Sequence, residues 1–262
     1  MRTNRFLFTC FLLLGLTALF SSCQKELSAD TDEPAATHDL IIRFNPAVDG
    51  NALVFGDPYT NPSGEPYTIS AFKFYISHIR LTHTDSNRSY AVKGDEYFLV
   101  NFADNASTLL QLKAVPSGYN SVSFLLGVDS IRNVSGAQTG ALDPAKGMFW
   151  TWNSGYIMAK LEGNTPVSSQ PNNAFEYHIG GFSGPDNTLK QISLTFPQGQ
   201  EMKLETGKTT TMTITADANA WFGGPNNIQL SVTPVCIMPG PLARQISENY
   251  AGMFTVTDIV NQ

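Results

Sequence analysis

Cysteine and charge are both scarce in this chain, and each scarcity excludes a class of protein. The 262 residues include three cysteines, and only 15% are Asp, Glu, Lys or Arg. The 22 acidic residues outnumber the 16 basic ones, which gives a net charge of −6. A nucleic-acid-binding protein needs surplus basic residues to neutralise phosphates, so we expect no nucleic-acid partner. With 42% apolar residues, the chain is too hydrophobic to be disordered.

Motifs of catalysis are missing as well. The sequence has no phosphate-binding loop, dinucleotide-binding fingerprint or paired-cysteine zinc motif. Ser154 lacks the glycine two positions earlier that a nucleophile elbow requires. Glu162 and Glu176 could be considered as a catalytic carboxylate pair, but nothing in the sequence places them together. We therefore expect solvated carboxylates at these positions and a protein that is not an enzyme.

Residues 1–22 have the features of a bacterial secretory signal. Two arginines precede an apolar run from Phe6 to Phe20, which is too short to span a membrane. Small residues then lead directly to Cys23, as in a lipoprotein signal. We predict cleavage before Cys23 and attachment of lipid to its sulfur, followed by a flexible polar tether over 23–37. The alternative is an ordinary signal peptide with an incidental cysteine.

The predicted anchor also indicates where the protein resides. Gln24-Lys25-Glu26 resembles the export tags that direct lipoproteins to the outer surface of Bacteroidetes cells. We expect an outer-membrane lipoprotein, either periplasmic or surface-exposed, that touches the membrane only through its lipid.

One cysteine remains for the mature domain. Cys10 leaves with the signal and Cys23 carries the lipid, so Cys236 has no partner for an intrachain disulfide. Cys236 is either a buried thiol at a strand end or, together with Met238, a soft copper ligand.

Residues 38–262 are predicted to form one all-β domain. Short β-rich runs alternate with turns rich in Gly, Pro and Asn, and no helices alternate with them. This pattern favours an antiparallel β-sandwich with long loops and a short C-terminal helix over 242–253. The predicted strands are 40–44, 67–82, 97–101, 121–128, 156–161, 175–179, 191–196, 209–216 and 228–232.

The longest of these strands carries a regular alternation. Phe72, Phe74 and Ile76 fall on one face, and the same alternation assigns His78 to that face. Lys73 and Tyr75 fall on the opposite face.

The long loop from Gly127 to Gly155 is the part in which we expect function. It is rich in glycine and contains Trp150 and Trp152, which could also simply pack the loop onto the sheets. Its oxygen-bearing side chains could hold a structural calcium ion, or they could form Asx turns that cap the loop. These side chains are Asp129, Asn133 and Asp143.

The motifs of this loop resemble those of the methanobactin-associated, MbnP-like copper-binding family. The resemblance runs through Gly127-Val128-Asp129-Ser130, residues 135–144 and residues 147–156. In order and spacing, the matching motifs cover nearly all of residues 38–258. The supporting matches are Tyr59–Asn61, Phe74–Ser77, Phe175–Gly181 and Asn249–Phe254.

The resemblance implies a copper-binding lipoprotein that acts in copper acquisition, storage or handling. Similar proteins bind copper through histidines and a kynurenine, which a separate di-haem enzyme related to cytochrome c peroxidases makes from a tryptophan. Carried over to this chain, the oxidised residue is Trp150 or Trp152 and the matched histidine is His178. The second histidine ligand is either His78 or His38.

The C-terminus departs from the family pattern. Many members have histidines soon after the motif matched by Asn249–Phe254, whereas this chain has none between Thr257 and Gln262. Fewer copper ligands are therefore available. The alternative function is a surface adhesion module that binds a carbohydrate or a protein through exposed tryptophans.

Overall fold

The computed structural model describes residues 37–86, 88–93, 96–152, 155–198, 200–203 and 208–261. These ranges belong to one structural unit, Ala35–Gln262. The predicted signal, Cys23 and the tether up to residue 36 lie outside them. Within the described ranges, no helix is both long and apolar enough to cross a membrane.

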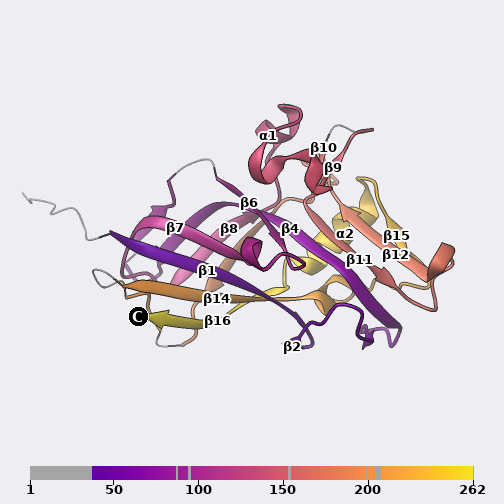
Figure 1. Ribbon diagram of the computed structural model, residues 1–262, viewed down its shortest axis with the longest axis horizontal. Helices are drawn as coiled ribbons and strands as arrows, with labels where there is room; N and C mark the ends of the chain where they lie inside the picture. The colour runs from indigo at the N-terminus through magenta and orange to yellow at the C-terminus, as the bar shows by residue number, and fades with distance from the viewer. Residues whose placement is uncertain are drawn as a thin grey trace, which may run out of the picture. The chain divides into compact units, whose positions relative to one another are not determined.

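Two β-sheets, built around the central strands β1 and β4, make up this unit (Figure 1). The first sheet has the strand order β16-β14-β1-β2, and β7 also pairs with β1. Its strands are β1 (Thr37–Val48), β2 (Asn51–Ala52), β7 (Leu109–Pro116), β14 (Thr209–Asp217) and β16 (Phe254–Asn261).

The second sheet has the strand order β13-β8-β4-β11-β12-β15, and β3, β5 and β6 pair with β4. Its strands are β3 (Tyr59–Thr60), β4 (Pro66–His83), β5 (Arg88–Ala91), β6 (Tyr97–Asn101), β8 (Ser121–Leu126), β11 (Ala159–Asn164), β12 (Ala174–Ile179), β13 (Lys190–Thr195) and β15 (Val235–Cys236). The remaining regular elements are the hairpin β9 (Phe149–Trp150) and β10 (Gly155–Tyr156), the helices α1 (Ser130–Val134) and α2 (Pro241–Tyr250), and short 3-10 turns.

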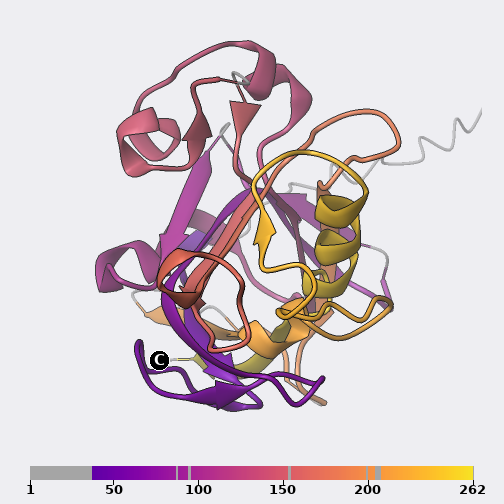
Figure 2. The ribbon, with the colours of Figure 1, turned by 90° about the vertical axis from the view of Figure 1, so that its right-hand side faces the viewer.

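The two sheets curl around a common core (Figure 2). Aromatic side chains fill much of this core. Phe44 of β1 makes edge-to-face contacts with Phe74 of β4 and Phe124 of β8, at ring-centroid distances of 5.6 and 6.1 Å. Phe254 of β16 lies 6.0 Å from Phe44 in the same geometry. Such contacts add to the stability gained from burying the rings. The predicted all-β class and the short C-terminal helix are confirmed.

The strand pairing differs from the prediction in two respects. β1 runs parallel to β14, and β12 runs parallel to β15, so the sheets are mixed. Alternation within a strand does not encode the direction of its neighbour, and β1 and β14 lie far apart in the sequence. Residues 228–232 were predicted as a strand but lie outside any strand, and 230–232 form a turn. The amides of Leu230 and Ser231 donate to the buried carboxylate of Glu65, at 2.6 and 3.0 Å, instead of to a neighbouring strand. Among the strands of five or more residues, β7 and β16 were not predicted.

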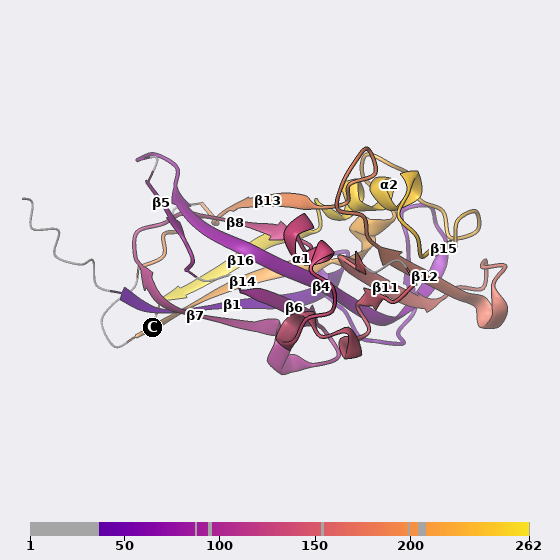
Figure 3. The ribbon, with the colours of Figure 1, turned by 90° about the horizontal axis from the view of Figure 1, so that it is seen from above.

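A β-bulge interrupts β4, which extends along much of the second sheet (Figure 3). The register with β8 shifts between Ser77 and Arg80, and His78 has a φ of 52°. Before the bulge, Phe74 and Ile76 face the core; after it, Ile79 and Leu81 do. One extra residue therefore reverses the alternation and leaves the His78 side chain 53% exposed. The prediction that His78 shares a face with Ile76 is wrong for this reason.

Candidate functional site

The segment between β8 and β11 folds over the outer face of β4. We call it the capping segment (residues 127–152 and 155–158); it contains α1 and the β9–β10 hairpin, which project from one side of the sheets in Figure 1. The Tyr75 hydroxyl of β4 donates to the carbonyl of Ala141 at 3.2 Å, and the Tyr156 hydroxyl donates to that of Leu142 at 2.8 Å. A second hydrophobic core lies beneath it, formed by Tyr75, Val128, Leu142, Met148, Trp150, Tyr156, Ile157 and Met158.

The two tryptophans of the capping segment differ in exposure. Trp150 of β9 is 6% exposed and Trp152 is 60% exposed, and their ring centroids are 5.5 Å apart. Trp150 lies against Gly180, directly after β12, where a Cβ atom would come within 2.6 Å of the indole. The missing side chain at position 180 therefore lets the indole rest on the strand that carries His178.

His178 belongs to a closed, hydrogen-bonded cluster on β11 and β12. Its Nε2 lies 2.6 Å from Oε1 of Glu162, and its side chain is 19% exposed. Lys160 lies opposite His178 across the two strands and places its Nζ 3.3 Å from the same carboxylate oxygen. The Glu162 carboxylate therefore lies within reach of two donors, the ring nitrogen of His178 and the ammonium group of Lys160.

Electrostatics reinforces this cluster. The hydrogen bond with His178 is the largest influence on Glu162, and together with Lys160 it overcomes burial and lowers the pKa of Glu162 to about 2. Lys73 of β4 lies opposite Lys160, and burial together with the Lys160 charge lowers the pKa of Lys73. Glu162 is accordingly ionised at neutral pH.

His78 lies beside a different carboxylate. Its Nε2 is 3.5 Å from Oδ2 of Asp129, and its ring meets the ring of Tyr97 edge-on at 6.1 Å. The Tyr97 hydroxyl donates a hydrogen bond to Asp129 Oδ2, and the backbone amide of Arg132 donates to Oδ1 at 3.1 Å. Burial opposes ionisation of Asp129, but these hydrogen bonds outweigh it and lower the pKa of the carboxyl. Burial and the hydrogen bond with Asp129 raise the pKa of Tyr97.

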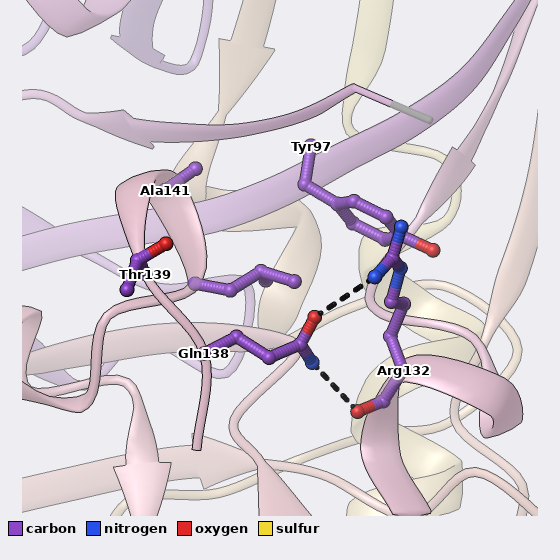
Figure 4. Close-up of a pocket in the computed structure, with 6 residues that line it drawn as sticks. Tyr97, Arg132, Gln138, Thr139 and Ala141 are labelled. Carbon is purple, nitrogen blue, oxygen red and sulfur yellow. Dashed lines mark hydrogen bonds between the residues drawn. The ribbon is translucent and has the colours of Figure 1, made fainter. Parts of the chain in front are cut away.

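A small polar cavity of about 220 Å³ opens next to this cluster (Figure 4). Tyr97, Arg132, Gln138 and Leu142 contribute to its lining. The Arg132 guanidinium lies over the Tyr97 ring, 5.8 Å from its centroid, and donates to Oε1 of Gln138 at 3.3 Å. Figure 4 shows this bond and the return bond from Gln138 Nε2 to the Arg132 carbonyl, which measures 2.8 Å.

The three predicted histidine ligands lie on different parts of the fold. His38 is in β1 of the first sheet. In β4, Lys73 is in register with Lys160, which is in register with His178, so His78 lies five residues, or about 16 Å, further along the second sheet. Among the described residues, no group of three or more His, Cys, Asp or Glu side chains is placed to hold a metal ion.

The residues considered for calcium have structural roles. Asp129 caps α1, and Asp143 caps the 3-10 turn Pro144–Lys146 by accepting from the Ala145 amide at 2.9 Å. Asn133 is buried, and its Oδ1 accepts from the Tyr156 amide at 2.9 Å. The structure thus shows the capping alternative for these side chains.

Cys236 is a buried thiol at the end of β15. Burial raises its pKa to about 11. The thiol form therefore predominates at neutral pH, whereas the thiolate is the form that binds metals.

Comparison with known proteins identifies the family. The MbnP family model matches residues 37–238, which is well over half of the chain. The chain belongs to the MbnP family. A solved structure of MbnP from Methylosinus trichosporium is similar to it with a TM-score of 0.48 and 16% sequence identity, covering 77% of this chain and 83% of that one. No curated protein sequence matches the chain.

Copper is the metal that the MbnP resemblance implies, and the surroundings of His178 fit it in donor type. Metal-bound histidines usually direct their second ring nitrogen to a carboxylate, which is the relation between His178 Nε2 and Glu162. The ring then has Nδ1 as its remaining donor atom. Imidazole suits both common oxidation states of copper.

Two contributors to these sites were missed in the sequence. Glu162 was assigned to solvent, and Tyr97 was taken only as part of a strand. A signal for Glu162 exists in the β-strand period, because residues two apart share a face and Lys160 and Glu162 therefore lie side by side. No local signal connects Tyr97 with Asp129, since the two are 32 residues apart and meet only through the capping segment.

Proposed function

We propose that this MbnP family member is a non-catalytic, copper-binding lipoprotein of the cell envelope. The observation that carries the proposal is the hydrogen bond between His178 of β12 and Glu162 of β11, close to Gly180, against which Trp150 packs. His178 would bind copper through Nδ1, and Glu162 would fix the ring in that orientation. A kynurenine formed from Trp150 or Trp152 would supply a further donor.

Trp150 and Trp152 would each suit oxidation to kynurenine for a different reason. Trp152 is the more accessible to a modifying enzyme, because most of its side chain is exposed. Trp150 is the one that contacts the strand of His178 through Gly180. The proposed modifying partner is a di-haem enzyme related to cytochrome c peroxidases.

A competition titration tests the copper site. Protein purified from its native host would be titrated with copper against a chromophoric chelator, as wild type and as His178→Ala. We expect the variant to lose stoichiometric tight binding while its circular dichroism spectrum stays unchanged. His83→Ala is the matched control, because His83 lies at the end of β4, away from β12. Equal affinity in wild type and His178→Ala would remove His178 from the site.

The mass of the tryptic peptide 147–160 tests the modification. This peptide contains both Trp150 and Trp152, and fragmentation would show which of them is a kynurenine. Two intact tryptophans in protein from copper-limited cells would exclude the modification under the condition in which it is needed.

A second candidate function follows from the exposed indole of Trp152. It lies beside Trp150, which lines a cavity of about 140 Å³ together with Phe182, Ser183 and Asp186. An exposed indole next to polar groups can stack on a sugar ring. Quenching of tryptophan fluorescence by an oligosaccharide, lost in Trp152→Ala, would favour this binding-module function over copper handling.

A further inference from the structure

The His78–Asp129 pair differs from the proposed copper site in position and in chemistry. We propose that His78 and Asp129, with Tyr97 orienting the carboxylate, bind one Zn²⁺ ion. The site lies where the bulge of β4 meets the start of α1.

The separation of the two donor atoms matches a shared metal ion. His78 Nε2 and Asp129 Oδ2 are 3.5 Å apart. A hydrogen bond between nitrogen and oxygen is shorter, at about 2.7–3.2 Å. Two ligand atoms bound tetrahedrally at about 2.1 Å from one ion lie about 3.4 Å from each other. The pair is therefore spaced for an ion between its atoms.

The hydrogen bonds around His78 are compatible with a lone pair on the nitrogen that faces Asp129. The Ser77 hydroxyl donates its only proton to the carbonyl of Gly127 at 3.2 Å. In the tautomer in which His78 Nδ1 donates to that hydroxyl oxygen, 3.0 Å away, Nε2 of the neutral ring carries no proton. In that tautomer Nε2 and the carboxylate oxygen are two acceptors that face each other, and a cation between them satisfies both.

The fold holds both ligands in place. The left-handed backbone of His78, with φ 52°, is a conformation that few residues other than glycine adopt, and the bulge there turns the imidazole out of the core toward Asp129. Asp129 is fixed by the Tyr97 hydroxyl on Oδ2 and by the Arg132 amide on Oδ1. Supporting hydrogen bonds of this kind orient metal ligands in known sites.

Donor type and access select the class of ion. One imidazole and one carboxylate suit Zn²⁺, whereas calcium prefers six to eight oxygen ligands. His78 is half exposed, so water can complete the coordination.

A third histidine–carboxylate pair provides the contrast. His83 Nε2 lies 3.7 Å from Oε1 of Glu201. The Ser86 amide donates to His83 Nδ1 at 3.4 Å, so the neutral ring carries its proton on Nε2 and points an N–H at Glu201. This pair has a similar spacing but needs no cation, which makes His83→Ala a matched control.

Isothermal titration with Zn²⁺ tests the site in the whole protein. We expect one Zn²⁺ to bind with micromolar affinity, and His78→Asn to weaken it at least tenfold; asparagine tolerates the left-handed backbone. Asp129→Asn keeps an acceptor for the α1 cap and should weaken binding similarly. Tyr97→Phe should weaken it about tenfold, as loss of a supporting hydrogen bond does.

Two further variants and a spectrum decide the outcome. His83→Ala and His178→Ala should bind Zn²⁺ as the wild type does, and X-ray absorption should show a single imidazole ligand. Because His178→Ala is expected to lose copper but keep Zn²⁺, failure of either proposal is visible separately. Unchanged Zn²⁺ affinity in a folded His78→Asn, or loss of binding in His83→Ala, would overturn the assignment, as would a wild type that binds no Zn²⁺.

Discussion

Two histidine–carboxylate pairs on the second sheet show how differently the same two residue types can be used. His178 and Glu162 come from adjacent strands, lie 2.6 Å apart and share Lys160. His78 and Asp129 come from a bulge and from the capping segment, and their nearest atoms stay 3.5 Å apart. The first pair, which we call the closed pair, is joined by a hydrogen bond. In the second, which we call the open pair, each side chain is held by hydrogen bonds to other residues. The 3.5 Å spacing of the second pair suits a metal ion between its two atoms, whereas the 2.6 Å spacing of the first suits a hydrogen bond.

Removing the carboxylate of the closed pair should have the largest effect. Glu162→Ala leaves Lys160 and His178 without their acceptor, and we expect it to lower the free energy of unfolding by about 3 kcal/mol. Urea denaturation would measure the loss. Glu176→Ala is the control, because Glu176 lies opposite Glu162 but is exposed and makes no ion pair of its own in the described structure. Equal effects of the two substitutions would contradict the contrast between the pairs.

Zn²⁺ should stabilise the protein only through the pair His78–Asp129. At a Zn²⁺ concentration of 100 times Kd, binding should raise the free energy of unfolding by about 2.7 kcal/mol. Thermal melts with and without Zn²⁺ would show this shift in wild type and in His178→Ala. A shift of the same size in His78→Asn would mean that the ion binds elsewhere.

Acid should weaken the closed pair over a defined pH range. Glu162 has a pKa of about 2 in the folded protein against an ordinary value of 4.5, so the unfolded chain takes up its proton first. The stabilisation is complete above pH 4.5 and is lost as the pH falls from 4.5 toward 2, by about 2 kcal/mol in all. Denaturation measured across this range gives curves of the free energy of unfolding against pH. The curve of the wild type should fall more steeply with decreasing pH than that of Glu162→Gln. Parallel curves would show that Glu162 is not the responsible group.

The smallest effect is expected at the bulge of β4. His78→Gly removes the side chain from a left-handed backbone and should raise the free energy of unfolding by about 0.5 kcal/mol, after the extra flexibility of glycine in the unfolded chain is counted. Metal-free protein must be used, because bound Zn²⁺ would reverse the sign. A clear loss of stability in the metal-free variant would show that the His78 side chain contributes more than its backbone conformation costs.

Much of the strand content was predictable, because each strand buries one side and the alternation is local. The expected strands at 97–101 and 175–179 correspond to β6 and β12, and the C-terminal helix corresponds to α2. The expected strand at 228–232 failed because a distant carboxylate, Glu65, binds its amides. Of the site, His178 was predicted, whereas its partner Glu162 was assigned to solvent, because a strand period does not tell which strands become neighbours.

The sequence by itself determined the all-β class and the motifs of the MbnP family, since these depend on residue types and local periodicity. Tertiary structure alone decided which histidine meets which carboxylate. A single extra residue in β4 turned His78 outward, and the capping segment carried Asp129 and Tyr97 to it. The reason is physical: side-chain direction in a strand changes with every residue inserted, and contacts between distant segments form only when the sheets and the cap pack together.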